Sequence, residues 1–334
     1  MSPKLKPLAE QTIIITGATS GHGLVTARMA AAAGARVMLA ARDGEALQRV
    51  TAGIRQQGGT AEYVVTDVSQ PGQVDRLAEE AILRFGGFDT WVNNAGSGAY
   101  GELAALSLED HRQVFETNYW GVVHGSLTAL RHLQGRPGGG ALINVGSING
   151  DIPSPILGAY NASKHAVKGF TDSLRIEVLA RGHPVAVTLV KPSAIGTPFP
   201  QHGRNITGGR AALPPPLYAP EVVARAILHA AQHQRRSVTV GGIGKLQVLA
   251  GQMLPNLFDR LGTGMSGVLS QQQHPVPHKA GNLYTPQGQD GMAEGRQHGR
   301  RFSTFTAAGR HRLALVGTAG ALAAGALWAA RRRR

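Results

Sequence analysis

The chain of 334 residues contains no cysteine, which excludes disulfide bonds, thiolate metal sites and a cysteine nucleophile. Aromatic residues account for only 5% and charged residues for 16%, yet a hydrophobic fraction of 42% is typical of a globular protein. No apolar run precedes residue 12, so the N-terminus does not predict a secretory signal peptide. These absences favour a globular protein of the cytoplasm.

Acidic side chains are missing from residues 296–334, where nine arginines lie. Residues 1–295 carry 25 basic and 20 acidic side chains, a balance of 25 − 20 = +5, so the tail supplies most of the formal net charge of +14. No basic patch interleaved with aromatic residues accompanies the tail, and we expect no nucleic-acid partner. His229 and His233 are four residues apart on a predicted helix, but they lack a third ligand, so we expect no metal site.

Short apolar runs alternate with helical patterns over the first 245 residues. Strands are predicted at Thr12–Thr16, Arg36–Ala40, Glu62–Val65, Thr90–Val92, Ala141–Val145, Val185–Val190 and Ser237–Val240. Helices are predicted at Gly23–Ala33, Glu45–Gln57, Val74–Phe85, Leu108–Leu133, Ala159–Ala180 and Pro220–Gln234. The strand runs do not alternate with polar residues, which is typical of strands buried on both faces. The pattern predicts an α/β fold, a doubly wound parallel sheet that binds ligands beyond the carboxyl ends of its strands.

The composition changes after Gly244, which divides the chain into an α/β domain (1–244), an extension (245–312) and an apolar helix with a basic end (313–334). Within the extension, Lys245–Leu269 is helical in pattern with a break at Pro255, and Gln271–Gly299 predicts an irregular arm. The uncharged stretch Leu313–Ala330 would form a helix of about 27 Å, marginal for crossing a bilayer. We expect it to lie on a membrane surface, or alternatively to form a C-terminal helix of a soluble protein.

The first predicted strand runs directly into a glycine-rich turn, Gly17-Ala18-Thr19-Ser20-Gly21-His22-Gly23. Glycine allows a sharp turn and a close approach of the main chain to a phosphate. The helix that follows offers free N–H groups and the positive end of its dipole. A lone glycine motif is weak evidence, but its place between the first strand and the first helix predicts a site for a dinucleotide pyrophosphate.

The second predicted strand ends at Ala40-Ala41-Arg42-Asp43, beside the expected adenosine ribose. An arginine binds a 2′-phosphate through two parallel hydrogen bonds, whereas a carboxylate binds the 2′-hydroxyl and repels the phosphate. Arg42 therefore favours NADP(H) over NAD(H). The alternative is that Arg42 is solvated and Asp43 binds the hydroxyl.

Further motifs follow the later strands: Asp67-Val68, Asn93-Asn94-Ala95-Gly96, Ser147, and Tyr160-Asn161-Ala162-Ser163-Lys164. With the glycine turn they make residues 8–242 resemble the short-chain dehydrogenase/reductase superfamily. The resemblance is specific, because five motifs occur in order at the expected strand ends. The resemblance implies a Rossmann fold, with residues 1–244 as the NADP-binding and catalytic domain. It also implies hydride transfer between NADP(H) and a carbonyl/alcohol pair.

The resemblance implies four catalytic residues, Asn118, Ser147, Tyr160 and Lys164. Tyr160 and Lys164 are four apart on a predicted helix and face the same way, so we expect the lysine and the positive nicotinamide of the cofactor to lower the tyrosine pKa from about 10. Tyr160 would exchange a proton with the substrate oxygen and Ser147 would polarise that oxygen. Asn118 would support a water that relays protons to Lys164.

The residues expected to bind the cofactor are Gly17, Thr19, Ser20, Gly21, His22, Gly23, Arg42, Asp67, Val68, Asn94, Ala95, Gly96, Tyr160, Lys164, Pro192, Ala194 and Thr197. One departure from the family pattern is Ser193, which stands where glycine usually follows Pro192 and tolerates positive φ less well. His22 stands where the family commonly has an aliphatic residue, and we expect it to line the cofactor groove.

Two segments, Ile148–Leu157 and Ala194–Leu217, are expected to close the substrate pocket. Its wall is largely apolar and predicts a hydrophobic alcohol or ketone; the residues are Ile148, Ile152, Pro153, Ile156 and Phe199. The resemblance suggests a homodimer or homotetramer through Leu108–Leu133 and Ala159–Ala180. A non-catalytic NADP-binding regulatory or scaffold protein is the alternative, but it predicts damage to the catalytic residues, and the sequence shows none.

Overall fold

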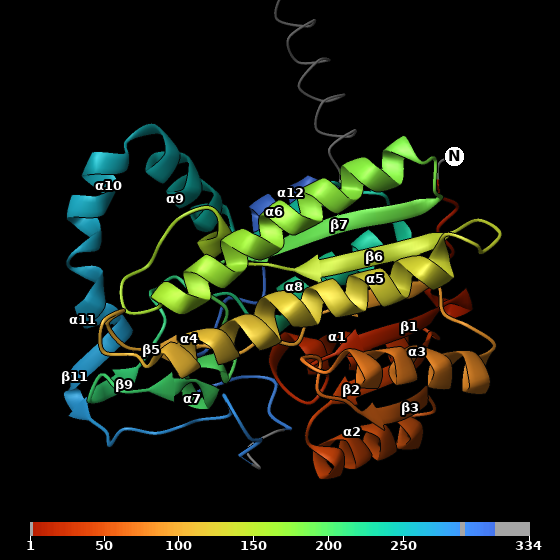
Figure 1. The fold of residues 1–334 in the computed structure, drawn as a ribbon, viewed down its shortest axis with the longest axis horizontal. Coiled ribbons are helices and arrows are strands. Elements are labelled where there is room, and N and C mark those ends of the chain that lie inside the picture. Colours follow the sequence, from red (N-terminus) through yellow and green to blue (C-terminus); the bar gives the residue numbers. More distant parts are fainter. Residues whose placement is uncertain (1–2, 288–290, 311–334) are drawn as a thin grey trace, which may run out of the picture.

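The computed structural model describes residues 3–287 and 291–310. Its centre is a seven-stranded sheet in the order β10-β7-β6-β4-β1-β2-β3, and all neighbouring strands are parallel (Figure 1). The strands are β1 (Thr12–Thr16), β2 (Arg36–Ala41), β3 (Thr60–Val65), β4 (Thr90–Asn93), β6 (Gly140–Val145), β7 (Val185–Pro192) and β10 (Ser237–Val240). The chain runs outward from β1 to β3 and then outward on the other side from β4 to β10. The strand order therefore reverses between β1 and β4, where such sheets bind ligands.

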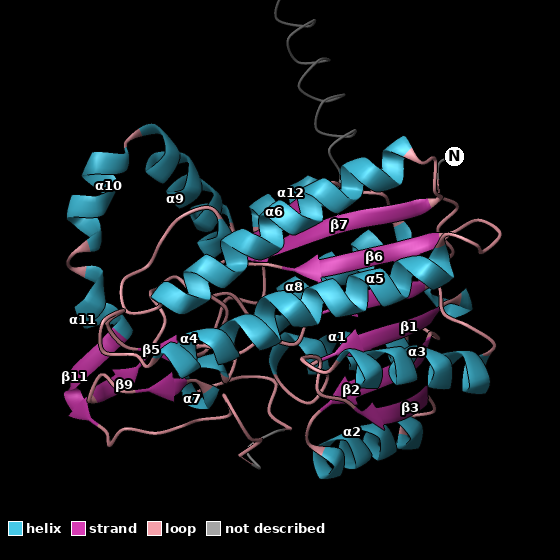
Figure 2. Cartoon of the chain, viewed as in Figure 1, coloured by secondary structure: helices cyan, strands magenta, loops and turns pink. Residues whose placement is uncertain are grey.

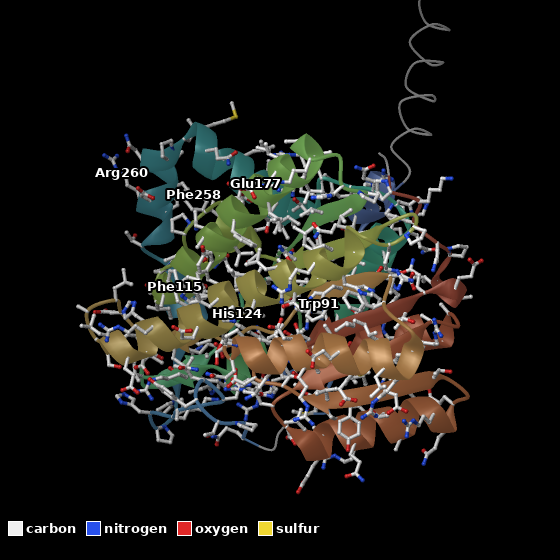
Figure 3. The ribbon with its side chains drawn as sticks, turned by 45° about the vertical axis from the view of Figure 1, so that its right-hand side comes forward. Trp91, Phe115, His124, Glu177, Phe258 and Arg260 are labelled. Atoms are coloured by element: carbon white, nitrogen blue, oxygen red, sulfur yellow. The ribbon has the colours of Figure 1, made fainter. Side chains whose placement is uncertain are left out.

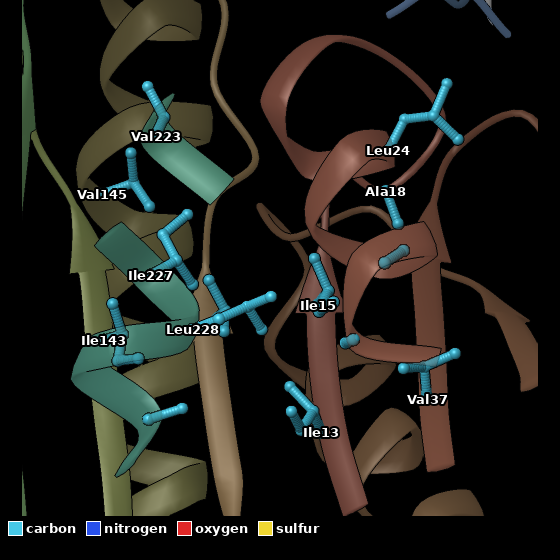
Figure 4. Close-up of a cluster of buried hydrophobic side chains, with 14 of the residues drawn as sticks. Ile13, Ile15, Ala18, Leu24, Val37, Ile143, Val145, Val223, Ile227 and Leu228 are labelled. Carbon is cyan, nitrogen blue, oxygen red and sulfur yellow. The ribbon is translucent and has the colours of Figure 1, made fainter. Parts of the chain in front are cut away.

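Helices cover both faces of this sheet (Figure 2). One face packs against α1 (Gly21–Ala32), α2 (Gly44–Gln56) and α8 (Pro220–Gln232), and the other against α3 (Pro71–Phe85), α5 (Gly121–Leu133) and α6 (Gly158–Ala180). Successive β1 side chains enter opposite cores, because strand side chains alternate between faces. Ile13 and Ile15 lie in the first core (Figure 4), and Ile14 lies in the second. This arrangement confirms the predicted doubly wound α/β fold.

The segment predicted as one helix over Leu108–Leu133 has an irregular middle. It consists of α4 (Leu108–Phe115), a π-helical turn at Glu116–Trp120, and α5. A π-turn inserts an extra residue and so changes which side chains face inward. Asn118 lies in this turn and is fully buried.

Shorter elements and the extension surround the carboxyl end of the sheet. These are β5 (Ala99–Tyr100), α7 (Phe199–His202), β8 (Arg204–Asn205), β9 (Gly209–Ala211), α9 (Gly242–Met253), α10 (Pro255–Gly262), α11 (Met265–Leu269), β11 (Ser270–Pro275) and α12 (Thr304–Arg310). Strand β11 pairs antiparallel with β9, so the expectation that the chain is irregular from Gln271 onward is wrong for its first residues. Phe305 of α12 covers Gly242, where a Cβ would lie 3.0 Å from the Phe305 Cβ atom.

Within residues 3–287 and 291–310, no helix is long and apolar enough to cross a membrane. The uncharged stretch Leu313–Ala330 lies outside the described residues.

Candidate active site

The glycine-rich turn lies at the carboxyl end of β1 and leaves no room for side chains. Gly17 adopts a left-handed φ of 65°, and a Cβ there would come within 2.8 Å of the Ala95 Cα atom. A Cβ on Gly23 would lie 2.2 Å from the Gly17 carbonyl oxygen. Asn94 fastens the turn, since its amide donates to the carbonyl oxygens of Thr16 (2.8 Å) and Gly17 (3.1 Å). At Gly17 and Gly23 the main chain is therefore exposed to close approach, as a pyrophosphate site requires.

A groove leads from this turn past the ends of β2, β3 and β4. It brings together the following predicted cofactor residues: Gly17, Thr19, Ser20, Gly21, His22, Arg42, Asp67, Val68, Asn94, Ala95, Gly96 and Thr197. Gly23 lies directly behind Gly17. The Asp67 carboxylate accepts hydrogen bonds from the Ser69 N–H (3.0 Å) and hydroxyl (2.8 Å), which holds the loop after β3 in place. The groove therefore gathers, at the carboxyl ends of the strands, the residues that a dinucleotide site requires.

His22 stands on the first turn of α1, and its side chain lies between this groove and the apolar cavity beside Tyr160. Its Nδ1 lies 2.6 Å from the Asn94 carbonyl oxygen Oδ1, which can only accept, so Nδ1 carries the proton. Burial lowers the pKa of His22 to about 4; the Asn94 hydrogen bond opposes this change and the Lys164 charge reinforces it. His22 is therefore neutral at pH 7, with Nε2 as an acceptor.

Arg42 at the end of β2 is bound to the C-terminal arm, which we define as residues 276–287 and 291–300. Its guanidinium donates to the carbonyl oxygens of Tyr284 (2.9 Å), Leu283 (3.4 Å) and Asn282. The interpretation of Arg42 as a solvated residue is therefore wrong. Asp43 also lines the groove, but its carboxylate caps α2 by accepting the Ala46 N–H at 2.9 Å.

The helix N-terminus beside the groove is less open than the sequence predicts. The Gly21 N–H donates to the Met292 carbonyl oxygen of the arm at 2.9 Å. The expectation that this N–H group is free is wrong, because a distant part of the chain supplies an acceptor.

Ser147, Tyr160 and Lys164 come together where the groove approaches the cavity. Ser147 follows β6 and hydrogen-bonds the phenol of Tyr160, which stands near the start of α6. The Lys164 ammonium, one turn further along α6, donates to the Val145 carbonyl oxygen at 3.0 Å. Its nitrogen lies 5.7 Å from the centre of the Tyr160 ring. The Ser147 hydroxyl, the Tyr160 phenol and the Lys164 ammonium thus lie close together.

The acid–base properties of this cluster are governed by burial. Burial raises the pKa of Tyr160 to about 12, and the Ser147 hydrogen bond opposes that change. Burial also lowers the pKa of Lys164 to about 8. In the protein by itself desolvation of the phenolate is the larger effect. The lowering expected from Lys164 and the nicotinamide together stays a prediction.

Asn118 positions the loop that carries Gly96. Its amide oxygen accepts the Ser97 N–H at 2.8 Å, and its nitrogen donates to the Ser97 carbonyl oxygen (2.9 Å) and the Ser163 hydroxyl (3.0 Å). A Cβ on Gly96 would lie 3.4 Å from the Asn118 oxygen and 3.8 Å from the Lys164 nitrogen. The structure therefore places the Asn118 oxygen and the Lys164 nitrogen close to the same point beside Gly96.

The loop after β7 accommodates Ser193 without backbone strain. Ile156 is the one non-glycine residue with a positive φ within the described parts of the chain, so Ser193 does not need glycine's freedom. Its side chain faces two other glycines: a Cβ on Gly241 would lie 2.3 Å from the Ser193 oxygen, and one on Gly244 would lie 2.6 Å from its Cβ. Pro192 and Ala194 line the cavity, and Thr197 lines both cavity and groove.

An apolar cavity of about 460 Å³ opens beside Ser147 and Tyr160. Predicted wall residues Ile148, Ile152, Pro153 and Phe199 line it, whereas Ile156 does not. The extension completes it from α9, α10 and α11 with Ile243, Leu246, Ala250, Phe258, Leu261, Met265 and Leu269. In Figure 3, Phe258 and Arg260 mark α10, with Arg260 directed away from the protein. A cavity of this size and lining suits a hydrophobic small molecule.

A family model described as short chain dehydrogenase matches residues 11–205. The chain belongs to the short chain dehydrogenase family. An uncharacterized oxidoreductase, YxnA of Bacillus subtilis (strain 168), is 44% identical over 272 residues, covering 81% of this chain and 76% of the relative. The 3beta-hydroxysteroid dehydrogenase 1 of Eggerthella lenta is 35% identical over 238 residues, covering 70% of this chain and 90% of the relative.

Solved structures of the family match the fold closely. A short chain dehydrogenase/reductase from Burkholderia phymatum in complex with NAD has a TM-score of 0.69 and 28% identity, covering 76% of this chain and 96% of the other. An alcohol dehydrogenase from Thermococcus sibiricus complexed with 5-hydroxy-NADP has a TM-score of 0.59 and 26% identity, covering 69% and 95%. Oxidoreductases of this family thus bind NAD or NADP compounds in this fold.

Two parts of the site were not foreseen from the sequence. The helical extension gave no sign that α9–α11 would line the cavity, although its apolar spacing was visible. The arm residues Asn282 and Pro286, which line the groove, lie in a Gln-, His-, Pro- and Gly-rich stretch without periodicity. No local sequence pattern indicates that Asn282 and Pro286 lie near Arg42.

Proposed function

We propose that this short chain dehydrogenase is an NADP(H)-dependent oxidoreductase that interconverts a hydrophobic ketone or aldehyde and its alcohol. The observation that carries the proposal is the position of the Ser147–Tyr160–Lys164 cluster, between the groove at the glycine turn and an apolar cavity. Bound NADPH would supply the hydride to the carbonyl carbon. Residues of the chain would transfer the proton and stabilise the charge on the substrate oxygen.

Tyr160 is the proposed acid. In the reduction, the carbonyl oxygen gains negative charge as its carbon gains the hydride, and the Tyr160 hydroxyl gives that oxygen its proton. Ser147 donates a hydrogen bond to the same oxygen and stabilises its charge. In the oxidation, the Tyr160 phenolate removes the hydroxyl proton of the alcohol. Because the phenol pKa is about 12, phenolate formation needs a neighbouring positive charge.

Lys164 supplies that charge from the protein. Its ammonium lies close enough to favour the phenolate electrostatically, and it is held in place by the Val145 carbonyl oxygen. Asn118, which lies beside Gly96 and binds Ser97, holds this loop so that a water can reach Lys164 and restore the proton.

The preference for NADP(H) rests on Arg42. Its partners among the described residues are carbonyl oxygens, which do not neutralise its positive charge. Asp43, the residue that would disfavour a 2′-phosphate, is engaged at the start of α2. A guanidinium that lines the groove therefore attracts a 2′-phosphate.

Substrate screening tests the proposed reaction. A panel of ketones of increasing apolar size, each incubated with NADPH, is expected to show turnover that rises with apolar size, because the cavity is apolar. Loss of absorbance of the reduced cofactor measures the rate. Turnover of small charged acids alone would contradict the apolar substrate, and NADPH binding without turnover across the panel would favour the non-catalytic alternative.

The pH profile tests the role of Lys164. Its ammonium exists below the pKa of about 8, so kcat/KM for ketone reduction is expected to be high below that pH and to fall about tenfold per unit above it. Lys164→Arg, which keeps its charge at all these pH values, is expected to lose the fall near pH 8. A wild-type profile that stays flat well above pH 8 would contradict the assignment.

The C-terminal tail and the exposed leucines of α9 and α10 bear on whether the protein contacts a membrane. We propose contact with the cytoplasmic face of a membrane through the tail at 313–334. Exposed leucines on α9 and α10 support it, since Leu246 and Leu261 both line the cavity and face solvent. Co-sedimentation with anionic vesicles would decide this: equal pelleting of the full chain and a chain ending at Arg312 would contradict it.

We also propose a homodimer or homotetramer through α4, α5 and α6. These helices expose large apolar side chains, namely Leu108, Leu127, Ile176 and Leu179. Light scattering that gives a monomer mass would contradict this assembly.

A further inference from the structure

The arm lies across the cofactor groove, although it begins about seventy residues after the end of the family-model match at residue 205. Asn282 and Pro286 line the groove together with the glycine turn. At the pyrophosphate side, the Gly291 N–H donates to the Thr19 carbonyl oxygen at 2.8 Å, and the Met292 carbonyl oxygen accepts from Gly21. At the adenosine side, Arg42 binds three consecutive arm carbonyls. The arm is thus attached at both ends of the groove.

The arm is also anchored away from the groove. The Tyr284 hydroxyl donates to the buried Asp110 carboxylate at 2.7 Å. Lys279 and Asn205 exchange two main-chain hydrogen bonds of 3.0 Å each, and the Gly295 N–H donates to the Gly196 carbonyl oxygen at 3.0 Å. These bonds join the arm to α4 and to the loop after β7. The arm is therefore a built part of the site, with defined partners along its described length.

The arm narrows the groove and occupies one of its donors. With the arm in place the groove holds about 140 Å³, less than the roughly 300–1,000 Å³ of most cofactor and small-molecule sites. The Met292 carbonyl oxygen of the arm accepts the Gly21 N–H, a donor of the glycine turn. Movement of the arm would widen the groove and release this donor.

We propose that the arm is an additional wall of the cofactor site, which lifts to admit the dinucleotide and closes over it, and that Arg42 holds it closed. This inference rests on the proposed function, since it requires a dinucleotide in the groove. A guanidinium has five N–H donors, so Arg42 has the capacity to bind arm carbonyls and a 2′-phosphate together. Arg42 thereby joins the 2′-phosphate to the arm, and NADPH should leave more slowly than NADH.

The rate at which reduced cofactor leaves tests the arm directly, without turnover. Stopped-flow fluorescence of NADPH and of NADH is measured with wild-type protein, Arg42→Gln and Tyr284→Phe. Tyr284→Phe removes only the anchor to Asp110, outside the groove. Both variants are expected to release NADH roughly tenfold faster, the effect of about 1.4 kcal/mol of lost hydrogen bonding. His278→Ala, at an exposed arm position, is the matched control and should leave both rates unchanged.

The outcomes separate the arm from the proposed function. If Arg42→Gln speeds the release of NADPH alone, Arg42 is a phosphate ligand only and the arm proposal fails. If Tyr284→Phe changes neither rate while its melting temperature shows a folded protein, the proposal fails as well. If wild-type protein binds neither NADPH nor NADH, it is the proposed function that fails.

Discussion

Replacing Tyr160 with phenylalanine is expected to lower kcat/KM for ketone reduction by about 10²- to 10⁴-fold, the usual contribution of a positioned acid. Phenylalanine keeps the ring and its contact with Phe199, whose centre lies 5.2 Å away, so the shape of the cavity is retained. Steady-state rates with NADPH measure the loss. Fluorescence titration should show that the affinity for NADPH changes little, because the hydroxyl acts on the substrate.

Tyr100→Phe is the matched control. Tyr100 packs against the same Phe199 ring, at 6.3 Å between centres, and its buried hydroxyl has no hydrogen-bond partner among the described residues. Removing this hydroxyl should leave activity intact and cost no stability. Equal losses in both variants would point to a packing effect. Full activity of Tyr160→Phe would contradict its role as the acid.

Replacing Gly23 with alanine is expected to weaken NADPH binding by at least about 100-fold, or nearly 3 kcal/mol. The new Cβ would lie 2.2 Å from the Gly17 carbonyl oxygen and 2.4 Å from the Asn94 amide nitrogen, so the glycine turn has to open. Both contacts form the floor of the cofactor groove. Fluorescence titration with NADPH measures the change in affinity, and circular dichroism shows whether the variant is folded.

Gly53→Ala controls for the added methyl group. Gly53 lies in α2, where a Cβ meets nothing within 4 Å. Alanine favours helix over glycine by about 1 kcal/mol, so this variant should melt at a higher temperature and bind NADPH normally. Unchanged NADPH affinity in Gly23→Ala would show that the glycine turn is not the phosphate site.

The sheet could be predicted from local sequence, and the cluster of Ser147, Tyr160 and Lys164 from the resemblance of its motifs to the family. Buried parallel strands have a distinctive apolar pattern, and residues that follow such strands necessarily meet at one edge of the sheet. Tyr160 and Lys164 share a helix, so their spacing alone placed them together. The pKa values could not be predicted in this way. The burial that raises the Tyr160 pKa is a property of the assembled site and not of its motif.

The arm could not be predicted for a different reason. Arg42 binds carbonyl oxygens about 240 residues further along the chain, and any residue has a carbonyl oxygen to offer. Main-chain acceptors leave no trace in the side-chain sequence. The same holds for Met292, whose carbonyl oxygen occupies the Gly21 N–H. Ser193 is a milder case, because its fit depends on two glycines, Gly241 and Gly244, that lie far from it in sequence.

The walls of the apolar cavity have a consequence for how this protein diversifies. Ser147, Tyr160 and Lys164 lie within the segment shared with the family, whereas α9, α10 and α11 lie beyond residue 205. One wall of the cavity is thus encoded apart from the cluster, while the opposite wall, with Ile148, Ile152 and Phe199, lies within the shared segment. Mutations in the extension would alter the shape of the cavity without touching the proposed proton-transferring groups or the sheet beneath them. Under the proposed function, such changes would let the same catalytic residues act on new substrates.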